Sequence, residues 1–365
     1  AIKLRILILI SFLCFGFVNG QNYNVLNFGA KGDGQTDDSK AFVEAWNATC
    51  GGEGDMKTLL IPTDKTLLLQ PVAFEGPCTS TSIKIQLDGD IVAPSNQKAW
   101  SNSQFEMWIS FTTVSGLIVV GSGKINGCGS SFWEQKVSQR PTALHFTKCD
   151  NLRISGITSI DSPKNHISIK ACENVAISNI NLLAPEESPN TDGIDISDST
   201  NVNIFESTIQ TGDDCIAINT GNTNINITRI NCGPGHGIKT TNGARIKTFP
   251  GGQGYARNIS FEDITLINAK NPIIIDQHYV NTQRLDAAED SAVAISSIKF
   301  IGFRGTTPNE NAITLDCSAT TRCKDVVMDG INITMADGEK PKVECKNVDG
   351  KSEDTILMRD CFQNA

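Results

Sequence analysis

The stretch CDNLRISGITSIDSPKNHISIKACENVAISNI, residues 149–180, contains one short pattern twice. In each copy an asparagine, Asn151 or Asn174, opens a run in which apolar and polar residues alternate. The pattern returns as STNVNIFES and NTNINITRI, so the asparagines at 151, 174, 201 and 224 are 23, 27 and 23 residues apart. Looser copies continue toward the end of the chain as ARNISFEDI, SSIKFIGF and KDVVMDGINI.

A repeat of this length, built from short β-branched strands and Asn or Gly turns, is typical of a parallel β-helix in which each coil stacks on the previous one. Asparagine at a coil corner tolerates left-handed backbone, and stacked copies can share hydrogen bonds. An antiparallel sandwich or barrel also has many short strands, but it would need hairpin turns about every 8–12 residues. The repeat is about twice that long, so we predict an all-β fold, a parallel β-helix.

The open end of such a solenoid is a sheet edge that needs a cover. The segment GDGQTDDSKAFVEAWNATC, residues 32–50, predicts a short N-terminal capping helix that ends at Cys50. Thr36, Asp37 or Asp38 can cap this helix. Its apolar stripe consists of Ala41, Phe42, Ala45 and Trp46.

The first residues, AIKLRILILISFLCFGFVNG, combine Lys3 and Arg5 with an apolar run too short to span a bilayer. We interpret residues 1–20 as a secretory signal that is cut after Gly20. Residues 21–365 are expected to form a single β-helix catalytic domain, because the composition is even and no Pro/Ser-rich linker divides it. No other segment is expected to cross a membrane.

The composition fits an extracellular protein. Cys14 lies in the signal, so 12 − 1 = 11 cysteines remain, and an oxidising compartment allows them to pair. Loss of Lys3 and Arg5 changes the formal net charge from -9 to 29 − 40 = −11. This acidity argues against a nucleic-acid partner, and an acidic substrate would need local cations. Glycosylation triplets stand at Asn47, Asn226, Asn258 and Asn332.

Polar phrases lie between the coils at SPNTDGIDI, TGDDCIAI and CGPGHGI. Their residues Asp192, Asp214 and His236 are 22 and 22 apart, so we expect them to stack as a column, with Asp213 over the same cleft. A single aspartate of this kind is usually a turn residue. Turns do not require adjacent aspartates, however, and stacked carboxylates repel unless protonation or function resolves the cost. Carboxyl groups with pKa values pushed apart are what acid/base hydrolysis requires.

The motifs NTD at 190–192, GDDC at 212–215, GHG at 235–237 and RIK at 245–247 resemble the four signatures of the polygalacturonases, glycoside hydrolases that cut the homogalacturonan of pectin. The likeness covers nearly the whole mature chain, including NVLNFGAKGDGQTDD, APEESPNTDGIDI and NPIIIDQ. The resemblance implies a right-handed parallel β-helix and hydrolysis with inversion, without a metal or a cofactor.

The same resemblance assigns catalytic roles by motif. Asp213 would be the general acid that protonates the glycosidic oxygen, and Asp192 and Asp214 would hold and activate the water. His236 would tune the protonation of the acid and bind near the scissile bond. An inverting pair should lie roughly 6.5–9.5 Å apart, a reach that two coil rises of about 4.8 Å would supply.

Substrate binding falls, on the same resemblance, to Arg245, Lys247 and Asn190. One departure affects these residues: the interval from Asn224 to Asn258 is 34 residues, enough for one coil, yet it contains both GHGIKT and NGARIKT. In the family these phrases belong to successive coils, so about one coil is missing.

Two arrangements of the shortened interval stay open. If GHGIK occupies the strand, NGARIKT turns away and Lys239 can replace the missing cation. If NGARIKT takes the strand, His236 is pushed into a turn. The downstream coils can also slide up by one rung, because contacts in a solenoid are between nearest neighbours.

The resemblance also implies four disulfides: Cys50 with Cys78, Cys215 with Cys232, Cys317 with Cys323, and Cys345 with Cys361. Cys149 and Cys172 are 23 residues apart at equivalent coil positions, so we expect them to stack as buried thiols. Cys128 is left unassigned.

The leading interpretation is therefore a secreted polygalacturonase that acts as a monomer on de-esterified pectin in a cell wall. The first alternative is a pectin-binding β-helix whose catalysis is weakened by the short coil. The second is a pectate lyase, which would use calcium and an arginine base; the paired aspartates and GHG argue against it.

Overall fold

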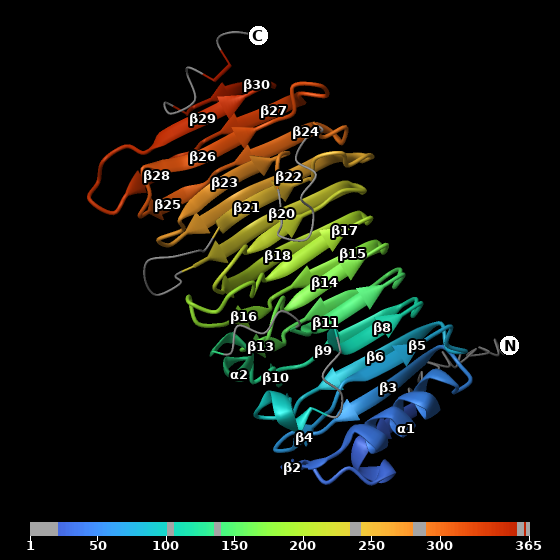
Figure 1. The fold of residues 1–365 in the computed structure, drawn as a ribbon. Helices are drawn as coiled ribbons and strands as arrows, with labels where there is room; N and C mark the ends of the chain where they lie inside the picture. The colour runs from blue at the N-terminus through green and yellow to red at the C-terminus, as the bar shows by residue number, and fades with distance from the viewer. Residues whose placement is uncertain are drawn as a thin grey trace, which may run out of the picture.

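The computed structural model describes residues 21–100, 106–134, 140–233, 242–279, 290–355 and 361–362. The chain forms a right-handed parallel β-helix whose coils follow one another from the N-terminal to the C-terminal end (Figure 1). Consecutive coils pair in parallel throughout, as in β14 with β17 and β20 with β22. The β-helix prediction is confirmed, and the antiparallel sandwich is excluded.

One sheet contributes a single strand from each coil and is called here the ten-stranded sheet. Its strands are, in spatial order, β5 Val72–Glu75, β8 Met107–Thr112, β11 Thr142–Thr147, β14 Ile167–Lys170, β17 Ile194–Ser197, β19 Ile216–Ile218, β21 Asn242–Lys247, β23 Asn271–Asp276, β26 Asn311–Asp316 and β29 Lys342–Lys346.

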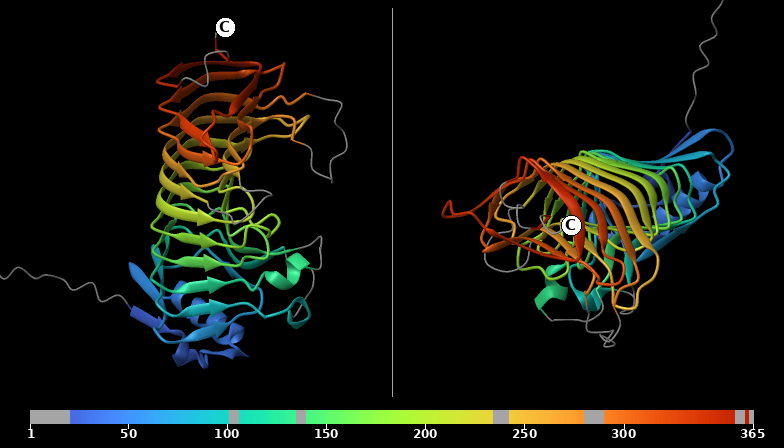
Figure 2. Two further views of the ribbon diagram at one scale, coloured as in Figure 1. Left: turned by 90° about the vertical axis from the view of Figure 1, so that its left-hand side faces the viewer. Right: turned by 90° about the horizontal axis from the view of Figure 1, so that it is seen from above.

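The remaining strands form a twenty-stranded sheet that wraps the other sides of the coils (Figure 2). They are β1 Gln21–Asn24, β2 Asp33–Asp37, β3 Met56–Ile61, β4 Thr66–Leu68, β6 Ser82–Leu87, β7 Asp90–Val92, β9 Leu117–Val120, β10 Lys124–Asn126, β12 Arg153–Ser155, β13 Thr158–Ile160, β15 Glu173–Ser178, β16 Asn181–Leu183, β18 Thr200–Gln210, β20 Asn222–Cys232, β22 Tyr255–Leu266, β24 Ala294–Ile301, β25 Arg304–Thr307, β27 Cys323–Asp329, β28 Asn332–Met335 and β30 Val348–Glu353.

The repeated asparagines form a ladder along the solenoid. Asn151, Asn174, Asn201, Asn224 and Asn258 all have φ between 54° and 59°. Each side chain donates to the asparagine of the previous coil, with Nδ2 to Oδ1 distances of 3.4, 3.1, 2.9 and 2.6 Å along the series. Left-handed backbone is tolerated by asparagine, and each amide supplies both a donor and an acceptor. The predicted corner role of these residues is confirmed.

The alternating pattern divides each strand of the ten-stranded sheet between core and surface. In β17, Ile194 and Ile196 are fully buried, and Asp195 between them faces outward. Register repeats this division from coil to coil: Ile194 lies beside Ile216, and Ile216 beside Ala244. The interior is thus a stack of like apolar side chains, and the outward positions of this sheet carry the polar residues discussed below.

The predicted capping helix is α1, Ser39–Cys50, and it lies at the N-terminal end of the solenoid (Figure 1). Its buried stripe packs on the first coils, with the rings of Phe42 and Trp46 centred 5.4 and 5.0 Å from that of Phe74. Asp38 stands at the N-cap, but its carboxylate accepts from the backbone N–H groups of Lys31 and Gly32 instead of capping the helix. The shorter helices are η1 Val25–Phe28, η2 Gln97–Ala99 and α2 Ser130–Glu134.

All four expected disulfides are present: Cys50–Cys78, Cys215–Cys232, Cys317–Cys323 and Cys345–Cys361. Cys149 and Cys172 are buried thiols, and the backbone N–H of Cys149 lies 3.2 Å from Cys172 Sγ. Cys128 is half-buried and free. Among the helices in the described ranges, none is long and apolar enough to cross a membrane.

The short interval is absorbed as a single coil. Asn258 continues the ladder directly from Asn224. NGARIK forms β21, and β21 pairs with β19, so that Ala244 lies beside Ile216. NGARIKT therefore takes the strand beside β19, which is the second arrangement expected from the sequence. His236 and Lys239 lie in 234–241, outside the described residues.

Candidate active site

Three carboxyl groups meet where two neighbouring strands of the ten-stranded sheet begin. Asp192 precedes β17, and Asp213 and Asp214 precede β19. Because Ile194 lies beside Ile216, the register carries Asp192 next to Asp214. One carboxylate oxygen from each of the three residues lies within 4.8 Å of the others. The column expected for Asp192 and Asp214, with Asp213 over the same place, is present.

Burial and mutual repulsion separate the proton affinities of these groups. Burial, followed by the charges of Asp192 and Asp214, raises the pKa of Asp213 to about 8. Burial also raises the pKa of Asp192, although the ammonium of Lys247 opposes this. The backbone N–H of Asp214 donates to Asp213 Oδ1 at 2.9 Å. At neutral pH Asp213 is therefore a protonated acid, and it stands beside two further carboxyl groups that contact cations.

These cations come from β21, which contains the RIK motif and is called here the RIK strand. Lys247 Nζ lies 3.4 Å from Asp192 Oδ2 and 3.3 Å from Asp214 Oδ2. Arg245 Nη1 lies 3.3 Å from Asp214 Oδ2, and Arg245 Nη2 lies 3.5 Å from Asp276 Oδ2. Both cationic side chains are only 13% exposed. These ion pairs exist because β21 is the direct neighbour of β19, with no coil between them.

Asn242 holds the column position next to Asp214 that the sequence analysis expected for His236. Its Nδ2 donates to Asp214 Oδ1 at 2.6 Å, and its own Oδ1 accepts from Asn271 Nδ2 at 2.6 Å. An amide chain thus orients Asp214 from the C-terminal side. The 22-residue spacing predicted His236 in this place, but the strand beside β19 begins at Asn242, so Asn242 follows Asp214 in the column.

The nearest oxygens of the acids are closer than expected. They lie within 4.8 Å of one another, where the sequence analysis expected roughly 6.5–9.5 Å between acid and base. The expected reach assumed two coil rises, but Asp192 and Asp214 belong to adjacent coils and are one rise apart.

Asp195 is a fourth carboxyl group at the centre that the sequence analysis did not single out. It faces outward from β17 three residues after Asp192. Burial and the charge of Asp192 raise its pKa well above the usual range, and its Oδ2 accepts from Asn165 Nδ2. The alternation in IDIS was a signal for its outward position, but its partner Asn165 comes from the preceding coil.

Arg140 was also not singled out. Its guanidinium donates to the carbonyl of Pro189 and to Oδ1 of Asn190, which belongs to the NTD motif. Arg140 and Asn190 are 50 residues apart. Only the stacking of β11, β14 and β17 brings them together.

The ring of Tyr279 lies over the cations of the RIK strand. Its centroid is 4.7 Å from Arg245 Cζ and 5.7 Å from Lys247 Nζ. Tyr279 therefore covers the outer side of the ion pairs and adds a cation–π contribution to their placement.

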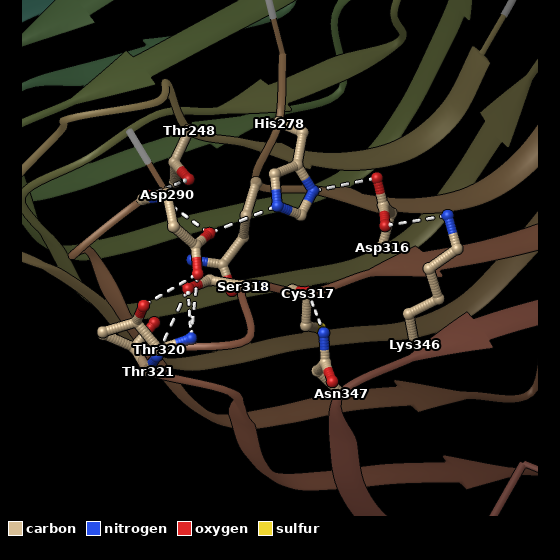
Figure 3. Close-up of polar contacts among 12 residues, drawn as sticks. Thr248, His278, Asp290, Asp316, Cys317, Ser318, Thr320, Thr321, Lys346 and Asn347 are labelled. Carbon is tan, nitrogen blue, oxygen red and sulfur yellow. Dashed lines mark hydrogen bonds and ion pairs between the residues drawn. The ribbon is translucent and has the colours of Figure 1, made fainter. Parts of the chain in front are cut away.

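A separate polar cluster lies farther along the same sheet (Figure 3). His278 bridges two carboxylates, with Nδ1 3.0 Å from Asp316 Oδ2 and Nε2 3.2 Å from Asp290 Oδ1. Asp290 also accepts from the backbone and hydroxyl of Thr320, and Lys346 pairs with Asp316 at 3.5 Å. This cluster ties the turn after β26 to β23 and β29.

The oxygens of Asp192, Asp213 and Asp214 are close enough for one metal ion to contact them all. Lys247 already contacts two of the three carboxylates, so positive charge is present in the cluster. The expectation that no metal is needed stays a prediction.

Comparison with known proteins places the chain in a family. The sequence model of the Glycosyl hydrolases family 28 matches residues 50–240 and again 238–355. The protein belongs to this family. Its two matched segments meet at 238–240, inside the interval where the coil is short.

The relatives in this family include plant polygalacturonases. A probable polygalacturonase of Arabidopsis thaliana is 45% identical over 95% of this chain and 82% of its own length. The polygalacturonase of Persea americana is 37% identical over 89% of this chain and 76% of its own length. In fold, the chain is similar to an exopolygalacturonase from Thermotoga maritima, with a TM-score of 0.69, 20% identity, and coverage of 91% of this chain and 90% of that one.

Proposed function

We propose that this family 28 glycoside hydrolase is a polygalacturonase that cleaves α-1,4-galacturonosyl linkages of homogalacturonan. The observation that carries the proposal is a protonated Asp213 in one cluster with Asp192 and Asp214, both of which contact Lys247. The similarity to plant polygalacturonases supports the choice of substrate.

Asp213 is the general acid. Its pKa of about 8 keeps the proton available at neutral and acidic pH, where it passes to the glycosidic oxygen as the bond to the anomeric carbon breaks. Asp213 then bears the negative charge, which the nearby cations Lys247 and Arg245 offset.

Asp192 and Asp214 act as the base. Lys247 Nζ contacts both carboxylates and opposes the rise in the pKa of Asp192, and Asn242 and Arg245 fix the orientation of Asp214. A water bound to this pair loses a proton as its oxygen attacks the anomeric carbon. Attack from the face opposite the leaving group inverts the configuration.

The test has two parts. Purified protein should release reducing ends from polygalacturonate, and ¹H NMR of the first product should show the β anomer. The α anomer would contradict inversion, and no release at any pH from 4 to 8 would contradict hydrolysis. Products that absorb near the ultraviolet band of an unsaturated uronide would instead indicate a lyase, which membership in a hydrolase family argues against.

A second candidate is a pectin-binding protein with weakened catalysis. It is favoured by the ion pairs of Arg245 and Lys247, since both cations contact the acids rather than standing free for a substrate carboxylate. Tight binding of oligogalacturonate with turnover far below that of the relatives would support it.

The protein is further proposed to be secreted to the cell wall. Four disulfides in the described residues are consistent with an oxidising compartment. Immunolocalisation of the full-length precursor in plant tissue tests this location.

A further inference from the structure

The two cations expected to hold the substrate are already engaged. Lys247 contacts Asp192 and Asp214, and Arg245 contacts Asp214 and Asp276. A galacturonate carboxylate reaching either of them must compete with protein carboxylates held at 3.3–3.5 Å, of which those of Asp192 and Asp214 are buried. A pectin chain bound here needs a further cation.

Arg140 is a cation of a different kind. The two acceptors of its guanidinium, the carbonyl of Pro189 and Oδ1 of Asn190, are both neutral. Within the described ranges no carboxylate forms an ion pair with it. A guanidinium has five N–H donors, so donors remain for a planar, two-oxygen acceptor.

Arg140 lies close enough to the acids to share their field. Burial lowers the pKa of Arg140, and the negative charges of Asp213 and Asp192 act in the opposite direction. Its anchor Asn190 is two residues before Asp192 in the chain. The guanidinium therefore lies on the NTD motif that carries Asp192.

The position of Arg140 complements that of the RIK strand. Arg140 precedes β11, which lies on the N-terminal side of β17 and β19, whereas Arg245 and Lys247 lie on β21, on the C-terminal side. A polysaccharide that passes over the acids along the solenoid therefore meets Arg140 on one side of the cleavage point and the RIK cations on the other.

We propose that Arg140 binds the carboxylate of a galacturonate unit on the N-terminal side of the acids and selects de-esterified substrate there. This inference rests on the proposed function for the class of ligand. A methyl ester removes the charge and one acceptor oxygen, so an esterified unit at this position loses the charge-assisted bonds.

The experiment measures binding, so that turnover is not needed. Calorimetry with the Asp213→Asn protein, to prevent cleavage, gives the Kd of hexagalacturonate and of its fully methyl-esterified form. The same measurements are made in the Arg140→Gln and Arg140→Lys variants. Arg153→Gln, an exposed arginine on β12 of the other sheet, is the matched loss of charge.

Arg140→Gln should weaken binding of the acid form about tenfold or more, as expected for a lost charge-assisted contact. It should leave the Kd of the esterified form unchanged, and it should reduce the salt dependence of binding of the acid form. The Kd of the acid form for Arg140→Lys should lie between the values for the parent and for Arg140→Gln. The Kd for Arg153→Gln should equal that of the parent.

Equal weakening of both forms by Arg140→Gln would overturn the inference and assign Arg140 to pinning the turn at 189–190. No change in either form, or no binding of the acid form by the parent, would also overturn it. Charge-selective binding through Arg140 without reducing-end release would retain the inference and reject hydrolysis, so the two failures are distinguishable.

Discussion

Asp213 is the proposed general acid, and its buried carboxyl group also lowers the free energy of unfolding at neutral pH. Its pKa is about 8 because the charged form is buried beside Asp192 and Asp214. In the unfolded chain the pKa returns to about 3.9. The native state therefore binds more protons than the unfolded state between these values, and stability must fall as pH rises through that window.

Asp213→Asn should separate the two effects. Activity on polygalacturonate should drop about 10²–10⁴-fold, because the amide cannot donate the proton. The free energy of unfolding should exceed that of the parent by about 1–4 kcal/mol at pH 7, and the difference should vanish near pH 4. Urea unfolding at both pH values measures this, and an equal difference at both would contradict the raised pKa.

Lys247 is the cation that contacts both Asp192 and Asp214. Lys247→Met should destabilise the protein by about 3–5 kcal/mol at pH 7, because the buried Asp192 loses its cation and the buried Asp214 keeps only Arg245. The loss should shrink as the pH falls, because protonation of Asp192, whose pKa burial raises, removes one of the two charges that Lys247 offsets. Lys351→Met, which removes an exposed pair with Glu353, is the control and should cost less than about 1 kcal/mol. Similar effects for the two variants would reject the buried network.

Each asparagine of the ladder has a left-handed backbone conformation and also forms side-chain hydrogen bonds between coils. Asn201 has φ 58° and exchanges hydrogen bonds with Asn174 and Asn224. The ladder thus pins each coil to the next at one corner, and it holds the register that stacks Asp192 beside Asp214.

Two substitutions of Asn201 distinguish these contributions. Asn201→Gly keeps the left-handed backbone at no steric cost and loses the ladder bonds, for an expected loss of about 1–2 kcal/mol. Asn201→Ala loses the same bonds and adds the strain of the left-handed region, about 1–2 kcal/mol more. Thermal unfolding ranks the three proteins, and an alanine variant as stable as the glycine variant would show that the backbone strain is absent.

The described part of the molecule is a stack in which each coil pairs with its nearest neighbours, and the short interval from Asn224 to Asn258 fits into this stack as one coil. At this place β21 pairs directly with β19, and Arg245 and Lys247 lie against the acids. Everything downstream keeps its own register, as β21 with β23 and β23 with β26 show.

One further coil can be inserted between 238 and 240. A length of 23 residues, which is the spacing of Asn201 and Asn224, should separate β19 from β21. The cations would move about 4.8 Å farther from Asp214, and the ion pairs would open. We expect kcat/KM on polygalacturonate to rise about tenfold or more. The rise should come from a lower KM, and the pH dependence of the activity should stay the same. A value equal to that of the parent would show that the short coil does not limit activity.

The sequence alone allowed much of the fold to be predicted, because the signals are local or periodic. The Asn repeat specified coil length and corner geometry, the alternating apolar residues specified which positions face the core, and the 22-residue spacing aligned Asp192 with Asp214. The site was harder to predict. Asp195 was overlooked although its outward position could be read from IDIS, and Arg140 carried no local signal.

What the sequence by itself determined is the repeat, and hence the β-helix and the meeting of the paired aspartates. What only the tertiary structure decided is which strand follows β19. The chain from Asn224 to Asn258 allowed either GHGIK or NGARIK in that place, and the packing of coil on coil selected NGARIK. That choice placed Arg245 and Lys247 against Asp214, and the stacking of β11 to β17 brought Arg140 to Asn190. The physical reason is that contacts between coils join residues about one coil length or more apart in the chain. Which residues meet depends on how whole coils align, and the local sequence around each residue does not show that alignment.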